Sequence, residues 1–156
     1  MTTVDRTAEL ESYVGCELGV SDWRTLEFEE FVAFGTISGD LHWIHTDRER
    51  ARRETPFGDA IAQGFLTLSL ITALSTQCFN IRQKDRSLNY GVERVRFTNP
   101  VLPGDRVRLR VKLGAYTATA PGAIRLTLSC TLEIEGKEKP ALVADWLSMV
   151  FDRSAA

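Results

Sequence analysis

Histidine and cysteine are scarce in this chain of 156 residues, which contains two histidines and three cysteines. Cys16, Cys78 and Cys130 are far apart and form no CxxC pair. An odd number of widely spaced cysteines argues against a disulfide framework, and the spacing does not fit a thiolate zinc site. We therefore expect three buried free thiols in a reducing cytosol.

An excess of one charge and long apolar runs are also missing. Nineteen Lys and Arg residues face twenty-one Asp and Glu, so the basic excess of a general nucleic-acid binder is absent. No run of about eighteen apolar residues is present to span a membrane, and the N-terminus lacks the pattern of a signal peptide. We expect a cytoplasmic protein without nucleic-acid or membrane partners, folded as one domain over residues 1–156.

The segment from Gly64 to about residue 80 contains no charged residue and is apolar on almost every side. A helix of this composition belongs inside a protein rather than on its surface. A second helix is expected over residues 27–37, where aromatic and aliphatic residues recur at helical spacing, followed by a turn at residues 38–40.

The second half of the chain alternates between apolar and polar residues. Period two is clear over residues 105–113 and 124–135, and further strands are expected over residues 88–97 and 141–151. These elements predict an α+β fold in which an antiparallel β-sheet wraps around the long central apolar helix of residues 64–80. The sheet of one small domain cannot cover the whole helix, so we expect a homodimer or a higher homo-oligomer.

Both histidines lie beside an aspartate, in the segment from Ser38 to His45. An acid and a base placed close together in a turn, next to a buried helix, are suited to proton transfer. Asp40, His42 and His45 are therefore the candidate site, although such residues in a loop are often structural or solvated. With Asp47 they also form a set of metal ligands, but the spacing matches no metal signature and we expect no metal.

Gly64 opens the apolar helix. Its backbone N–H lies at a helix N-terminus, where amide groups point toward an anion and suit an oxyanion site. The alternative is that this glycine only permits close packing or a turn.

The segment Ser38-Gly39-Asp40-x4-His45, followed by Gln63-Gly64-Phe65-Leu66, resembles the signature of the MaoC-like dehydratases, the R-specific enoyl-CoA hydratase family. The motif of residues 39–51, with Trp43-Ile44 before His45, resembles the nodulation protein N-like branch of that family, as do residues 90–97 and 100–107. The likeness extends from about residue 13 to residue 150.

This resemblance implies a hot-dog fold and a hydratase/dehydratase that adds water reversibly to trans-2-enoyl thioesters, giving (R)-3-hydroxyacyl thioesters. The acyl group is carried by coenzyme A or by an acyl carrier protein, and no cofactor is needed. Asp40 and His45 match the catalytic pair, and Gly64 matches the residue whose N–H binds the thioester oxygen. Two other functions remain open, namely a hot-dog acyl thioesterase and a non-catalytic subunit that binds acyl thioesters.

Further roles follow from the resemblance alone. Thr72 matches a hydroxyl that orients the aspartate, or is a helix hydroxyl bonded to a backbone carbonyl. His42 stands where many members have an asparagine and is a candidate for positioning the water. The candidate substrate contacts are Gln63, which stands where many members have a histidine, together with Phe65, Arg94 and Arg96. Arginines in such runs either bind phosphates or form solvated faces.

Overall fold

The computed structural model describes residues 1–153, so the last three residues of the expected domain lie outside the described part. An antiparallel sheet is its main feature, with strands in the order β2-β6-β7-β8-β5 and with β3 also paired to β6. The strands are β2 (Glu17–Val20), β3 (Arg24–Thr25), β5 (Lys84–Phe97), β6 (Arg106–Ala120), β7 (Ala123–Ile134) and β8 (Leu142–Asp152). The expected α+β class with an antiparallel sheet is thus confirmed.

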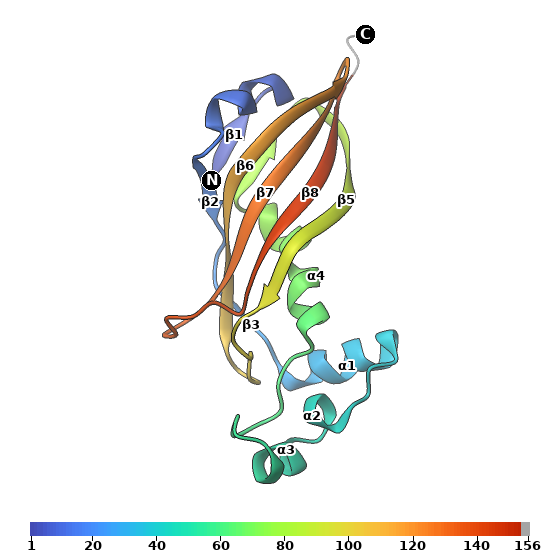
Figure 1. Cartoon of the computed structure of the whole chain (residues 1–156), viewed down its shortest axis with the longest axis vertical. Helices are drawn as coiled ribbons and strands as arrows, with labels where there is room; N and C mark the ends of the chain where they lie inside the picture. Colours follow the sequence, from blue (N-terminus) through green and yellow to red (C-terminus); the bar gives the residue numbers. More distant parts are fainter. Residues whose placement is uncertain (154–156) are drawn as a thin grey trace.

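The remaining elements lie against this sheet or at its ends (Figure 1). A parallel pair joins β1 (Thr2–Val4) to β4 (Phe79–Ile81). The helices are the 3-10 helix η1 (Thr7–Tyr13), α1 (Phe28–Ser38), α2 (Trp43–Thr46), α3 (Arg48–Glu54) and α4 (Gly64–Ser75). Figure 1 shows α1, α2 and α3 gathered at one end of the sheet, near the end of α4 from which that helix begins.

Alternation along the strands builds the core. In β7 every second residue from Ile124 to Ile134 is buried, and the neighbouring strand β6 buries Val107, Leu109, Val111 and Leu113. The register pairs Leu109 with Leu132, so apolar residues of the two strands cover the same face. Strand β6 continues well past the expected end at residue 113, because residues 115–120 still pair with β7 across the turn at residues 121–122.

Only one side of helix α4 packs against this apolar face of the sheet. Leu66, Leu70, Ile71 and Leu74 are all at most 7% exposed, whereas Phe65 is 70% exposed. The helix also ends at Ser75, whereas the sequence predicted an end near residue 80. The prediction was wrong because Phe79 and Ile81 continue the apolar run but belong to the short strand β4. Apolarity alone does not distinguish a helix from a short strand. No helix within residues 1–153 is long and apolar enough to span a membrane.

The three cysteines differ in their surroundings. Cys78 and Cys130 are buried, and burial raises their pKa values to about 11 and about 12. Cys16 is exposed, so the expectation of three buried thiols was wrong for this residue, which follows the 3-10 helix in a surface turn.

We expect a thiol reagent such as Ellman's reagent to modify Cys16 rapidly in the native protein, because the thiolate is the reactive form and the other two thiols are buried with raised pKa values. Modification of Cys78 and Cys130 should require unfolding by denaturant. The Cys16→Ser variant is the control, and rapid modification of this variant in buffer would contradict the assignment.

Candidate active site

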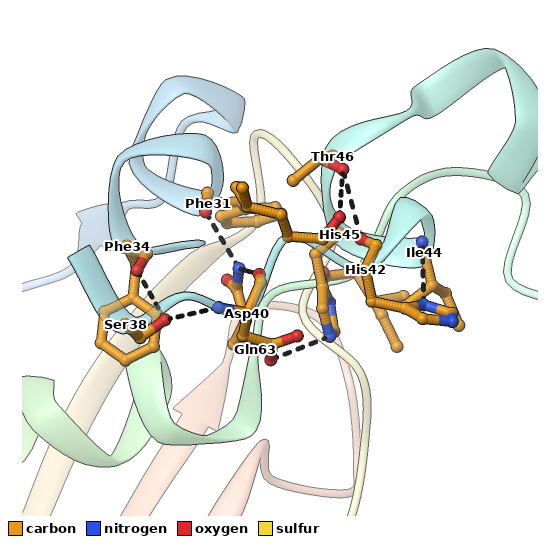
Figure 2. A network of polar contacts seen from close by, with 11 residues as sticks. Phe31, Phe34, Ser38, Asp40, His42, Ile44, His45, Thr46 and Gln63 are labelled. Carbon is orange, nitrogen blue, oxygen red and sulfur yellow. Dashed lines mark hydrogen bonds and ion pairs between the residues drawn. The ribbon is translucent and has the colours of Figure 1, made fainter. Parts of the chain in front are cut away.

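Asp40 follows directly after the end of α1. Gly39 has φ of 82°, a left-handed conformation that glycine adopts without a steric penalty, and its N–H donates to the Gly35 carbonyl. The Asp40 N–H donates to Ser38 Oγ at 3.3 Å. This turn leaves the side chain of Asp40 about half exposed, at 51%, and directs it toward α2 (Figure 2).

His45 lies on α2 and faces this carboxylate. Its Nδ1 is 2.7 Å from the Ile61 carbonyl oxygen, and its Nε2 is 3.7 Å from Asp40 Oδ2. A carbonyl oxygen only accepts hydrogen bonds, so Nδ1 carries a proton and Nε2 of the neutral ring is a free base. The Nε2–Oδ2 distance is longer than a hydrogen bond, and a water placed about 2.8 Å from both atoms would bind the two groups at once.

The segment before α4 holds the histidine in place. Ile61 is bonded twice to α2, because its carbonyl accepts from His45 and its N–H donates to the Ile44 carbonyl at 3.1 Å. Asp59 anchors the same segment through ion pairs with Arg48 at 2.7 Å and Arg52 at 2.8 Å. The hydrogen bond from Arg48, supported by Arg52, holds the pKa of Asp59 well below its ordinary value.

Gly64 is the first residue of α4, where backbone N–H groups have no partner within the helix. A Cβ placed on Gly64 would lie 3.1 Å from three atoms of the Phe97 ring, so a side chain would require the ring to move. His45 and Gly64 line one pocket of about 310 Å³, together with Phe57, Thr67 and Phe97. The His45 ring and a helix N-terminus therefore face the same cavity, whose other walls are largely apolar.

His42 and Asp47 are occupied in capping helices. His42 precedes α2, and its Nδ1 accepts from the Ile44 N–H at 3.3 Å. The Asp47 side chain precedes α3 and accepts from the Arg50 N–H at 2.9 Å. In residues 1–153 no three His, Cys, Asp or Glu side chains come together as a metal site. The role of His42 in positioning water stays a prediction.

Thr72 lies further along α4, on the side that faces strand β5. It lines a second pocket of about 280 Å³ together with Leu68, Tyr90 and Trp146, and not the pocket of His45 and Gly64. Within residues 1–153 its hydroxyl forms no hydrogen bond to Asp40. The contacts within one chain therefore do not test whether Thr72 orients the Asp40 carboxylate, and this role stays a prediction.

The four predicted substrate contacts are placed differently from one another. Gln63 is buried at the start of α4, whereas Phe65 is exposed and its ring lies 6.0 Å from that of Phe97, beside the pocket. Arg94 has an unusual φ of 52° at an irregularity of β5 and forms an ion pair with the buried Asp145, whereas Arg96 is exposed. Arg94 already has an anionic partner, so its contact with substrate phosphates stays a prediction.

Several parts of the site were missed by sequence reasoning. The Ile61 carbonyl is a backbone group and leaves no signal in the sequence. Phe97 approaches Gly64 from a strand more than thirty residues away. Asp59 gave a weak signal, because it is an acidic residue that follows the arginine-rich helix α3, and the ion pairs show that Arg48 and Arg52 neutralise it.

The comparisons with known proteins place this chain in a family. A model described as the MaoC like domain matches residues 9–123, and the chain therefore belongs to the MaoC-like family. The expected α+β hot-dog arrangement is confirmed along with this family.

Individual relatives are similar over almost the full chain. It is 41% identical to the 3-hydroxyacyl-thioester dehydratase Z of Mycobacterium tuberculosis, covering 93% of this chain and 95% of that protein. It is 40% identical to nodulation protein N of Rhizobium leguminosarum, covering 92% and 89%. Among solved structures, the (R)-hydratase from A. caviae involved in PHA biosynthesis has a TM-score of 0.70 at 25% identity, covering 86% of this chain and 94% of that one.

We expect Asp59→Asn to destabilise the protein at pH 7 by about 1–3 kcal/mol, because two arginines lose a charged partner. The pKa of Asp59 is lowered in the folded state, so its contribution is complete above about pH 5 and is lost as the pH falls below about 4. Urea unfolding of the wild type and the variant, from pH 7 to pH 3, should therefore give converging free energies.

The control is Asp5→Asn, which breaks the exposed ion pair with Arg82 and should change the stability little at any pH. A difference between wild type and Asp59→Asn that stays constant over the whole pH range would contradict the role given to Asp59.

Proposed function

We propose that this chain is a hydro-lyase that adds water reversibly to trans-2-enoyl thioesters and yields (R)-3-hydroxyacyl thioesters. The observation that carries the proposal is the pair of Asp40 Oδ2 and His45 Nε2, 3.7 Å apart, next to a pocket that also reaches the free N-terminus of α4. The R configuration and the thioester substrate rest on likeness to the named dehydratase and (R)-hydratase.

In the hydration direction, Asp40 and His45 hold one water between them. One of the two groups takes a proton from the water as the water oxygen bonds to carbon 3. The pair then delivers a proton to carbon 2, so that both groups return to their starting protonation states. The proton on His45 Nδ1 is committed to the Ile61 carbonyl, so Nε2 is the nitrogen that exchanges protons with the substrate. Dehydration is the reverse of these steps.

The Gly64 N–H is proposed to stabilise the negative charge that develops on the thioester oxygen. Addition to carbon 3 of the enoyl thioester moves negative charge to the thioester oxygen, and a free N–H at a helix N-terminus stabilises that charge. The absence of a side chain at Gly64 lets the thioester approach this amide beside the Phe97 ring. We propose that the acyl group is carried by coenzyme A or by an acyl carrier protein, the two carriers that present such thioesters.

We expect the wild type to remove the enoyl-thioester absorbance of crotonyl-CoA, or of a longer enoyl-CoA. The Asp40→Asn variant should be slower by about 10²–10⁴ because it loses an acid–base group. Asp47→Asn is the matched control, since Asn also caps a helix and its rate should stay near that of the wild type.

The same assay separates the other candidate functions. Release of free thiol without hydration would identify a thioesterase, and tight binding of acyl-CoA without turnover would identify a non-catalytic subunit. Full activity of the Asp40→Asn variant would contradict the assignment of Asp40 and His45 as the catalytic pair.

We further propose that two copies of the chain associate through strand β5. This strand is at one edge of the main sheet within residues 1–153, and its Leu88, Tyr90 and Val92 are 53%, 61% and 46% exposed. An edge strand that exposes apolar side chains is a template for pairing with a second chain. The open side of α4 lies next to it, since Leu68 of the helix and Val92 of the strand line one pocket.

Light scattering after gel filtration should give the wild type twice the mass of one chain. A Leu88→Glu, Val92→Glu double variant should have the mass of one chain, because charges on this edge oppose pairing. Glu138→Leu, a change of similar size in the loop between β7 and β8, serves as a control. A wild type that runs as a single chain would contradict the dimer.

A further inference from the structure

Gln63 is the residue immediately before α4, and its side chain is turned away from the helix. A residue at this position normally accepts a hydrogen bond from an N–H of the first helical turn, and Gln63 makes no such bond. Its Nε2 instead donates to the Phe31 carbonyl at 3.0 Å and to the Asp40 carbonyl at 3.4 Å (Figure 2). The side chain therefore joins the start of α4 to the turn that carries Asp40.

The orientation of this amide is fixed by its surroundings. Exchange of its oxygen and nitrogen would place Oε1 against two carbonyl oxygens, so only the observed orientation supplies a donor. In this orientation Oε1 is buried without a hydrogen-bond partner among residues 1–153, and Gln63 is only 1% exposed. An unpaired buried acceptor and an unused helix cap both cost stability, and a methionine would avoid the first cost in a similar volume.

The surrounding backbone is shaped to admit the contact. A Cβ placed on Gly35 of α1 would lie 2.8 Å from the Asp40 carbonyl oxygen and 3.2 Å from Gln63 Nε2. A larger residue at position 35 would therefore force the Asp40 turn and the amide away from α1. The contact depends on Gly35 as well as on the amide.

We infer that Gln63 is a positioning residue, which fixes the distance between the Asp40 carboxylate and the Gly64 N–H. The two groups belong to different segments, and Gln63 is covalently attached to one and hydrogen-bonded to the other. The Asp40 side chain is half exposed, and its Oδ2 lies 3.7 Å from His45 Nε2, beyond hydrogen-bond distance, so the position of the carboxylate depends on the backbone that Gln63 contacts. This inference rests on the proposed hydration reaction, in which both groups act on the same thioester.

The test compares two substitutions of matched size, measured per folded site. In Gln63→Met the donor is lost, and kcat for an enoyl thioester should fall on the order of 10–100-fold with KM within about threefold, since small displacements of reacting groups have effects of this size. In Gln63→Glu a protonated carboxyl still donates to one carbonyl, whereas a carboxylate repels both. The kcat of Gln63→Glu relative to wild type should therefore rise as the pH is lowered, and that of Gln63→Met should not.

Gln77→Met is the control, because Gln77 also bonds the backbone, at the Asp22 N–H, but lies beyond the other end of α4. It should leave kcat unchanged. Wild-type kcat in folded Gln63→Met, or the same pH dependence in both Gln63 variants, would overturn the inference.

Amide hydrogen exchange supplies a readout that does not require activity. Exchange over residues 38–42 should be at least about tenfold faster in Gln63→Met than in wild type and unchanged in Gln77→Met. If the wild type hydrates no enoyl thioester, the proposed function fails, and exchange still decides whether Gln63 tethers Asp40. Unchanged exchange in Gln63→Met would overturn the tether even in an active enzyme.

Discussion

One face of helix α4 packs on the sheet, beside strands β6 and β7, and is buried there. The buried side chains are those of Leu66, Leu70, Ile71 and Leu74. Burial of each such side chain is worth about 1.5–3 kcal/mol, so the axial position of this helix is strongly determined. Because α4 begins at Gly64, the same packing determines where its free N–H groups lie. The core of the protein thereby places the group that we propose binds the thioester oxygen.

The rest of the candidate site is assembled from short segments that have little core of their own. The turn at Asp40, helix α2 and the segment before α4 are held mainly by hydrogen bonds to backbone carbonyls, including those of Ile61, Ile44 and Asp40. The ion pairs of Asp59 add a charged anchor at the edge of this region. The sheet and helix α4 thus form a scaffold on which polar contacts arrange Asp40 and His45, the proposed acid–base pair.

The sequence predicted those parts of the molecule that follow from periodicity and from motif spacing. Alternation defined strands β6 and β7, and the start of α4 was placed correctly at Gly64. The end of α4 was placed too late, because an apolar run does not reveal where a helix gives way to strand β4. The Asp40–His45 pair was found from its residue types, but the Ile61 carbonyl and the Phe97 ring were not. Contacts that use backbone atoms, or that come from distant strands, leave no local pattern to detect.

The hydrogen bond behind His45 is made to a backbone group rather than to a side chain. Many histidines that act as bases are backed by a carboxylate, whereas this ring is backed by the Ile61 carbonyl, which brings a dipole but no formal charge. The acceptor that orients the ring is a main-chain group, so no substitution of a side chain removes it, and the orientation of His45 depends on the position of the backbone at residue 61.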